Sequence, residues 1–166
     1  MIMMTLIAVF APLNVSAVDT YVIDNDDAQG YETSSVGFAT YLQDSMLYYG
    51  DARRQLSNSP SNGLYTWHYP VRYKQGNFYC GLRVFLYHDT FTDPAASYYG
   101  NCANQYYTTL IGRINQNYAP AGWNAIAVTT LEQLGQTGNR SSYVDLRPSG
   151  TANCYTGADA IEMRIW

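Results

Sequence analysis

Apolar and polar residues alternate along many short stretches of the chain, which is the pattern of half-buried β-strands. The stretch NFYCGLRVFLYH is the clearest, because every second residue from Phe78 to Leu86 is apolar or a cysteine. Further strand-like stretches are TYVI, LYTWHY, YYTTLIGRINQ, WNAIAV, SYVDLR and AIEMRIW. Clusters of Gly, Pro, Asn and Ser lie between them and predict turns.

These strands predict an all-β fold, most simply a single jelly-roll-like β-sandwich. Only residues 41–56 have a partly helical spacing, which Gly50 and several tyrosines weaken. No internal repeat and no low-complexity linker divides the sequence, so one domain is expected.

The first stretch of the chain, residues 1–17, has the pattern of a signal peptide. It is uncharged, largely apolar, and ends in Val15-Ser16-Ala17, the small-residue spacing of a signal-peptidase site. No Lys or Arg precedes the apolar run, which a start codon further upstream would explain. We expect cleavage after Ala17 and a mature domain, residues 18–166, that is secreted or at the cell surface. No later stretch has the roughly 20 apolar residues of a membrane-spanning helix, so no membrane insertion is expected.

The composition favours recognition over catalysis. Charged residues make up 13% of the chain, while aromatic residues reach 15% and include 17 tyrosines. An average protein has about 25% charged residues. A surface rich in tyrosine suits exported proteins that bind sugars or one another, because the ring is flat and apolar and the hydroxyl forms hydrogen bonds. The net charge is −4 and no basic stripe is present, so nucleic acid is not an expected partner.

The three cysteines, Cys80, Cys102 and Cys154, have no C-x-x-C spacing, so a zinc site is not expected. Cys80 lies on the apolar face of its predicted strand and is expected to be a buried thiol. Cys102 and Cys154 lie among Gly, Asn, Ala and Thr, where loops form. In an oxidising compartment we expect these two cysteines to form a disulfide.

The acidic stretch VIDNDD could be a calcium loop or a turn at the end of a strand. Counted from Asp24, the sixth and twelfth positions of an EF-hand loop are Gln29 and Ser35 instead of Gly and Glu, so that motif is absent. Asp and Asn are common turn formers, and a turn is the favoured interpretation. A looser calcium site near Asp24 to Asp27 stays open, and no metal or cofactor is predicted.

Residues suited to catalysis are few. His68 and His88 are the only histidines, both lie in predicted strands, and no G-x-S-x-G or H-E-x-x-H motif is present. Glu32 and Asp44 are candidates for an acid pair, but their spacing is also that of ordinary surface residues. We expect a non-catalytic protein, and a secreted hydrolase is the least favoured alternative.

Several motifs along residues 21–165 occur in an order found in a known family. They are VIDNDD followed by GY, YYGDAR, YTWHYPV, GNFYCGLRVFLYH, INQNYAPAGWNAIAV and GADAIEMRI. Together they resemble the golvesin or xanthan-lyase C-terminal-like domain, a β-sandwich appended to many bacterial exported proteins. The sequence departs from that family at Ala52, where a tyrosine is usual, and lacks an early tryptophan, for which Phe38 is the nearest aromatic residue.

The resemblance implies structural roles for four residues. Trp67 and Trp123 align with core positions of the family, so both are expected to be buried. The first and last strands of such a sandwich are expected to lie side by side, which would bring Asp24 and Asp159 together. A carboxylate there can accept hydrogen bonds from backbone N–H groups of turns.

The resemblance also implies a carbohydrate-binding role. From the excess of tyrosine, we expect a polysaccharide or other glycan to be held by solvent-facing tyrosines. Adjacent strand residues point to opposite faces, so one ring of each tyrosine doublet should face solvent. With the arginine of the YYGDAR motif, the candidate ligand-binding residues are Tyr48, Tyr49, Arg53, Tyr98 and Tyr99. The alternative is a self-assembling subunit of an extracellular fibre or matrix, in which the same surface forms subunit contacts.

Overall fold

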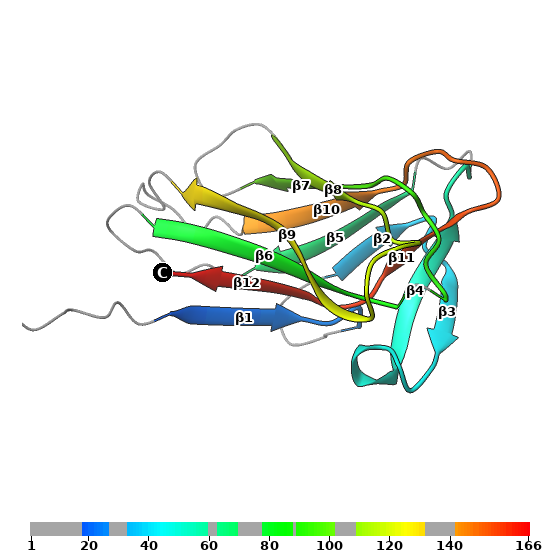
Figure 1. Ribbon diagram of the computed structural model, residues 1–166, viewed down its shortest axis with the longest axis horizontal. Coiled ribbons are helices and arrows are strands. Elements are labelled where there is room, and N and C mark those ends of the chain that lie inside the picture. The colour runs from blue at the N-terminus through cyan, green and yellow to red at the C-terminus, as the bar shows by residue number, and fades with distance from the viewer. Residues whose placement is uncertain are drawn as a thin grey trace, which may run out of the picture.

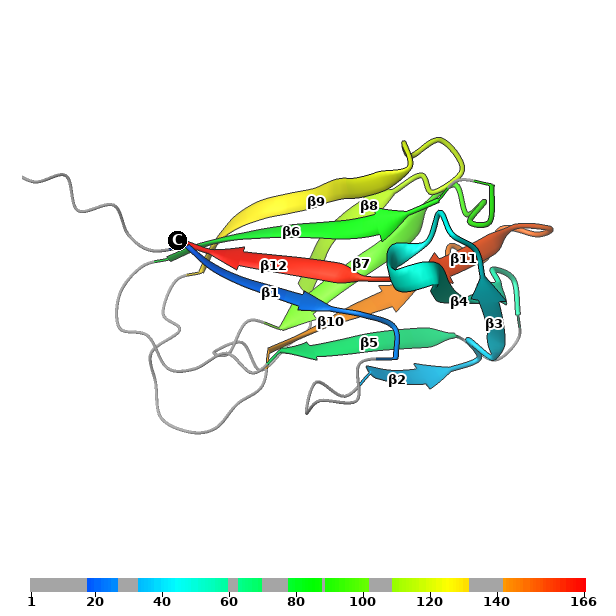
Figure 2. The same ribbon diagram turned by 90° about the horizontal axis from the view of Figure 1, so that it is seen from below.

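The computed structural model describes residues 18–26, 33–59, 63–69, 78–87, 89–101, 109–131 and 142–166. These residues form an all-β fold in which two antiparallel sheets pack face to face, and a third, smaller sheet lies at one end (Figures 1 and 2). The β-sandwich expected from the alternating sequence pattern is confirmed.

The sheet nearest the viewer in Figure 1, which we call the front sheet, has four strands. In spatial order they are β1 (Asp19–Ile23), β12 (Ile161–Ile165), β6 (Phe78–Leu86) and β9 (Gly122–Leu131). β1 pairs with β12 in antiparallel register, with Ile23 opposite Ile161. The first and last of the described strands are therefore neighbours, as the family resemblance implied.

The back sheet has five strands and lies behind the front sheet. Its strands in spatial order are β2 (Thr33–Val36), β5 (Leu64–Tyr69), β10 (Ser142–Arg147), β7 (Ala96–Asn101) and β8 (Thr109–Ile114). The third sheet, which we call the end sheet, has the order β11 (Tyr155–Ala158), β4 (Asp51–Leu56) and β3 (Thr40–Gln43). Figure 2 shows the front and back sheets as separate layers with the end sheet at one side.

The strands β2, β3, β4, β7 and β11 were not predicted, because they are short or lack a clear apolar alternation. The partly helical residues 41–56 form most of β3, a single 3-10 turn at Tyr48–Gly50 (η1), and β4. Gly50 has φ +90°, a left-handed conformation that glycine adopts readily and that ends the turn. In the described part of the chain, no helix is long and apolar enough to cross a membrane.

The core lies between the front and back sheets and follows from side-chain alternation. On β5, Tyr65, Trp67 and Tyr69 point inward and are at most 2% exposed. The front sheet contributes the buried apolar residues Ile23, Leu82, Val84, Leu86, Ile161, Met163 and Ile165. The three aromatic side chains of β5 thus pack against an aliphatic layer on the opposite sheet.

Two buried polar side chains fix the end of the sandwich beside the end sheet. The Gln116 side-chain amide donates to Tyr98 Oη at 3.1 Å and to the carbonyl of Gly157 at 2.9 Å. Asp93 accepts hydrogen bonds from the hydroxyl of Thr156 and from several turn groups. Burial alone would raise the pKa of Asp93, but these hydrogen bonds outweigh it and lower the pKa. Gln116 and Asp93 thus have hydrogen-bond partners that offset the cost of their burial.

Replacing Trp67 by alanine should destabilise the fold strongly. The side chain is 1% exposed, and its Nε1 donates to the main-chain carbonyl of Asp159 at 3.2 Å, which links the back sheet to the segment that leads into the front sheet. Removing a buried tryptophan side chain costs about 3 to 5 kcal/mol. Urea or thermal unfolding of Trp67→Ala measures this loss, and a variant that unfolds like the parent would contradict the core role of the ring.

Candidate functional site

The outer face of the front sheet carries aromatic and arginine side chains. Because alternate residues of β6 from Leu82 to Leu86 point into the core, Arg83 and Phe85 point outward. On the neighbouring strand β9, the residue opposite Phe85 is Trp123. The strands that build the core thus also present a surface to solvent.

Four rings pack together on this face, and we call Tyr48, Tyr49, Phe85 and Trp123 the aromatic cluster. The ring centroid of Tyr48 lies 4.4 Å from that of Tyr49, 5.5 Å from that of Phe85 and 5.3 Å from that of Trp123. Phe85 and Trp123 meet edge to face at 5.4 Å. These separations are typical of favourable aromatic pairs. Tyr49 is 82% exposed, so its ring packs against Tyr48 and is otherwise open to solvent.

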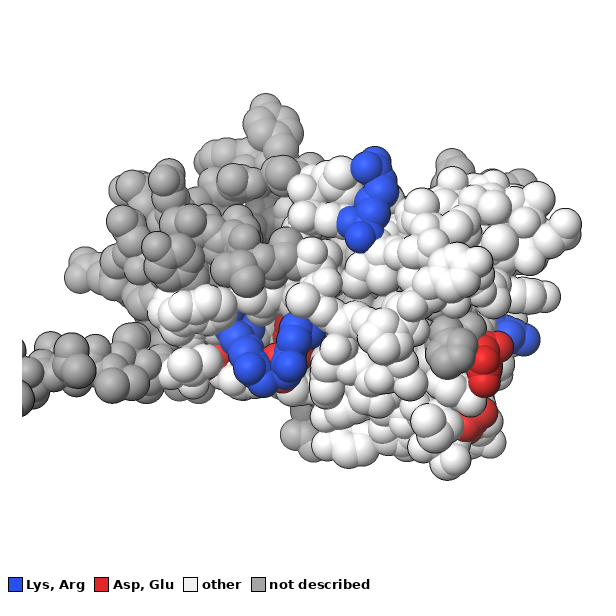
Figure 3. Space-filling view, in the orientation of Figure 1, with Lys and Arg blue, Asp and Glu red and all other residues white. Residues whose placement is uncertain are grey.

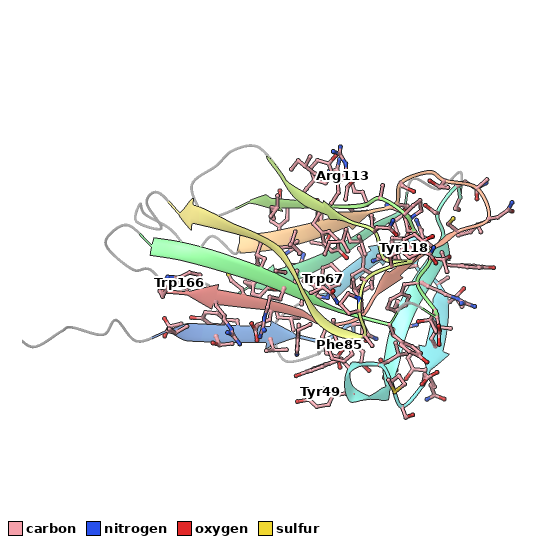
Figure 4. The ribbon with its side chains drawn as sticks, viewed as in Figure 1. Tyr49, Trp67, Phe85, Arg113, Tyr118 and Trp166 are labelled. Atoms are coloured by element: carbon pink, nitrogen blue, oxygen red, sulfur yellow. The ribbon has the colours of Figure 1, made fainter. Side chains whose placement is uncertain are left out.

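The turn η1 projects Tyr49 from the surface. Tyr49 has φ +49° and ψ 14°, in the left-handed region that residues other than glycine seldom adopt. Such a conformation costs about 1 to 3 kcal/mol and persists where the surrounding structure enforces it, often at binding sites. Figure 4 shows the Tyr49 side chain standing out from this turn, near Phe85.

Asp159 holds the turn from the inside. Its Oδ2 accepts a hydrogen bond from the N–H of Tyr48 at 3.0 Å, and the carboxyl group is almost fully buried. Burial raises the pKa of Asp159 to about 8; the hydrogen bond from Tyr48 opposes this rise, and the negative charge of Asp24 adds to it. The pairing of β1 with β12 brings these two aspartates into one neighbourhood.

The acidic segment after β1 is held by short polar contacts. Asp24 Oδ1 accepts from the N–H of Asn25 at 2.8 Å, and Asn25 Nδ2 donates to Asp51 Oδ1 at 2.7 Å. Asp27 lies outside the described residues. Across the described ranges, no three or more His, Cys, Asp or Glu side chains gather as a potential metal site. The contacts seen here are those of a turn.

Beside the aromatic cluster, two arginines and one glutamate lie on the same outer face of the front sheet. Glu162 of β12 lies opposite Arg83 of β6 and accepts two parallel hydrogen bonds from it, each 2.8 Å long. Arg164 Nε lies 2.6 Å from Glu162 Oε1. Burial would raise the pKa of Glu162, but the hydrogen bonds and charges of both arginines outweigh it and lower the pKa. Arg83 Cζ lies 5.6 Å from the centre of the Trp123 ring, which connects the two groups.

The prediction that Tyr98 faces a ligand is wrong. Its side chain is fully buried, its Oη accepts from Gln116, and burial raises the pKa of the hydroxyl. Tyr99 points the opposite way, to the outer face of the back sheet, where Arg147 Cζ lies 4.4 Å from its ring centre. Alternation therefore divides this doublet between core and surface, and places Tyr99 on the sheet opposite the aromatic cluster.

The expectation that Trp123 is a core residue is also wrong. It is half-buried on the outer face, because it pairs with Phe85, whose neighbours Val84 and Leu86 already point inward. Arg53 lies in the end sheet, where its Cζ is 4.7 Å from the Tyr41 ring centre. Of the predicted ligand-binding residues, the structure brings together Tyr48 and Tyr49.

The residues considered for catalysis form no acid–base pair in the described ranges. Glu32 and His88 lie outside those ranges. Asp44 accepts from the N–H of Met46 at 2.9 Å and shapes a turn, while His68 lies on the back sheet. A polar hollow of about 590 Å³ has no carboxylate or histidine among its described lining residues, which are Ser57, Asn58, Ser59, Gly63, Leu64, Arg147, Pro148, Ser149 and Gly150.

The expected disulfide stays a prediction. Cys102 lies outside the described residues, as does the side chain of Cys80. Cys154 is half-buried and unpaired among the described residues. β7 ends at Asn101, at the end of the sandwich away from the turn that carries Cys154 (Figures 1 and 2). The described strands therefore give no support to a bond between Cys102 and Cys154.

Sequence reasoning missed Phe85, Arg83, Glu162 and Arg164. A signal for the first two was present, since alternation along β6 places them opposite the predicted core positions. No comparable signal placed the other two beside them, because the pairing of β12 with β6 joins segments far apart in the sequence.

Asp159 should make stability fall as the pH rises through the neutral range. Its pKa is about 8 in the folded protein, against an ordinary value of 3.8. Folding therefore takes up a proton between these two pH values, so the free energy of unfolding decreases as pH increases between them. Asp159→Asn removes the titrating group, and with it this dependence of stability on pH, while the shape of the side chain changes little. Between pH 5 and about 8.5, the melting temperature of the variant relative to that of the parent should increase as the pH rises.

Other titrating groups, the histidines included, occur in both proteins and cancel in the comparison. A difference in melting temperature that stays constant over this range would mean that Asp159 is ionised throughout and that its buried environment is more polar than the contacts imply.

No family model matches the chain, and no curated protein matches its sequence. Solved structures do match its fold. A segment of Paenibacillus xanthan lyase superposes with a TM-score of 0.62 at 19% identity, covering 87% of this chain and 13% of the lyase chain.

The exo-β-1,3-galactanase of Phanerochaete chrysosporium matches with a TM-score of 0.48 at 13% identity, covering 89% of this chain and 29% of that chain. The chain thus spans much less than two thirds of either matched protein. The likeness to the xanthan lyase segment shows a shared β-sandwich fold.

Proposed function

We propose that this chain is a secreted, non-catalytic module that binds a polysaccharide or another glycan on the outer face of its front sheet. The observation that carries the proposal is the aromatic cluster, in which the exposed ring of Tyr49 is supported by the rings behind it. Mutual packing holds the rings of Tyr48, Phe85 and Trp123, and the buried carboxyl of Asp159 holds the backbone of the turn at Tyr48, so these three rings would lose little side-chain entropy on binding.

The chemistry of this face fits a sugar ring. A pyranose presents C–H groups that stack on aromatic faces, and hydroxyl groups that exchange hydrogen bonds with tyrosine and arginine. Burial raises the pKa of Tyr48 to about 12, so its hydroxyl stays protonated at physiological pH. Flat rings with a few polar groups at their edge are typical of ligand sites that recognise shape and orientation.

Membership of the golvesin or xanthan-lyase C-terminal-like family is part of the proposal. Residues 48–50 of the YYGDAR motif form the turn that presents Tyr49, which gives that motif a role at the face. The fold likeness to a segment of a xanthan lyase supports the same idea. The matched segment is 13% of the lyase chain, a share that fits the proposal that this chain is an accessory module.

Self-assembly into an extracellular fibre is the second candidate function. β1 is an edge strand of the front sheet, with a partner strand on one side only among the described strands. Edge strands can pair with a strand of another molecule. In a fibre the exposed ring of Tyr49 would contact a second copy of the chain instead of a glycan.

Replacing Tyr49 by alanine should weaken glycan binding without unfolding the protein. The exposed ring contributes contact area but little core packing, and loss of such a contact costs about 2 kcal/mol, or roughly 30-fold in Kd. The control is Tyr118→Ala, because Tyr118 is also 82% exposed and lies away from the cluster. Retention on a polysaccharide array and melting temperature are measured for both variants.

Equal retention of the two variants would contradict the proposed site. Sedimentation of the parent protein tests the fibre: large assemblies that Tyr49→Ala dissolves, with no glycan retained, would favour self-assembly. Turnover of a glycan by the purified chain would contradict the non-catalytic assignment.

Export predicts that the mature protein begins at Val18. The apolar stretch and the small residues before Ala17 are the basis for this expectation. N-terminal sequencing of protein recovered from outside the producing cells tests it, and a folded cytosolic protein that retains Met1 would contradict it.

A further inference from the structure

Two arginines on the outer face of the front sheet cover the carboxylate that pairs with them. The side chain of Glu162 is 6% exposed, whereas that of Arg83 is 31% exposed and that of Arg164 is 46% exposed. A ligand on this face would therefore contact the guanidinium groups of the arginines, while the carboxylate of Glu162 is buried beneath them. The three side chains together carry one net positive charge.

The geometry leaves hydrogen-bond donors unused on this face. Contacts to Glu162 employ Nε and Nη2 of both arginines. Each guanidinium carries five N–H donors in a planar fork, and among the described residues none accepts from Nη1 of either arginine, so this group can donate to an incoming acceptor. Such a fork matches the two oxygens of a carboxylate, and charge-assisted bonds to carboxylates are stronger than bonds to neutral hydroxyls.

The arginines lie between two aromatic positions on the same face. At one end is the aromatic cluster around Phe85, and at the other the ring of Trp166 lies on Gly81, close enough that a Cβ there would be 3.1 Å from it. Figure 4 shows Trp166 and Phe85 at separate places along the front sheet. Gly81 and Phe85 are four residues apart on β6, or roughly 13 Å. Arg83 lies midway between them.

The net charge of these three side chains is positive, whereas the whole chain has a net charge of −4. Figure 3 shows little charged surface over the front sheet apart from one group of basic and acidic side chains, and Arg83, Glu162 and Arg164 lie on this face. A general attraction to acidic polymers is therefore not expected, and among the described residues of this face Arg83 and Arg164 are the groups that would create a preference for them.

We propose that the glycan bound on this face is an acidic polysaccharide, whose carboxylate groups are held by Arg164 and Arg83 while its sugar rings lie along the aromatic positions on either side. This rests on the proposed glycan-binding function and names the ligand class. The two exposed guanidinium groups set the preference, and the rings provide contact area for any sugar chain.

The test compares acidic polymers with esters of the same sugar chain in which the carboxylates are neutralised by a methyl or a hydroxypropyl group. Retention of the parent protein is measured by affinity electrophoresis on polygalacturonate and its methyl ester, and on alginate and its propylene glycol ester. The variant is Arg164→Gln, in which Glu162 keeps both hydrogen bonds from Arg83. The matched control is Arg113→Gln, which removes an exposed arginine from the back sheet and changes the net charge equally.

The parent should prefer an acidic polymer over its ester by about tenfold, and the preference should weaken as salt is raised. Arg164→Gln should lose this preference while Arg113→Gln keeps it. Equal retention of acid and ester by the parent, or an unchanged preference in Arg164→Gln, would overturn the acidic ligand class and leave glycan binding intact. No retention on any of the four polymers and none on the polysaccharide array would overturn glycan binding and the ligand class together, whereas retention of neutral glycans alone on that array would overturn the acidic ligand class only.

Discussion

The candidate site depends on two hydrogen bonds that Asp159 accepts in the interior of the protein. Its carboxyl group accepts a hydrogen bond from the backbone N–H of Tyr48, and its main-chain carbonyl accepts one from the Nε1–H of Trp67. One residue in the segment between β11 and β12 thus connects the aromatic core with the turn that presents Tyr49. Because a buried charge is costly, the same carboxyl binds its proton tightly, and its ionisation couples the turn to pH.

The face and the core are two sides of the same strands. On β6 the inward positions pack against the back sheet, and the outward positions carry Arg83 and Phe85. A rigid core thereby fixes the spacing of the surface groups, which is what a recognition surface needs to bind without reorganisation. The bidentate contact between Arg83 and Glu162 adds to this order, since it fixes a guanidinium that would otherwise sample many rotamers.

Local sequence patterns predicted more of the fold than of the site. Alternation located β6, β5 and β12 and hence the sandwich, whereas β4, with the sequence DARRQL, lacks such a pattern and forms because β3 and β11 pair with it. At the site, the YYG motif pointed to Tyr48 and Tyr49, whose rings the structure places in contact; their part in binding stays a proposal. Trp123 was assigned to the core from family position, because nothing local shows which face of β9 the back sheet covers.

By itself the sequence determined the strand class, through period-two alternation, and a surface that is rich in tyrosine and poor in charge. It also limited the catalytic options, since the chain has two histidines and neither a G-x-S-x-G nor an H-E-x-x-H motif. Only the tertiary structure decided that Tyr98 is buried and that Glu162 lies between two arginines. The physical reason is that strand pairing and sheet packing are long-range: alternation divides side chains into two faces, but which face meets water is set by the sheet that packs against it.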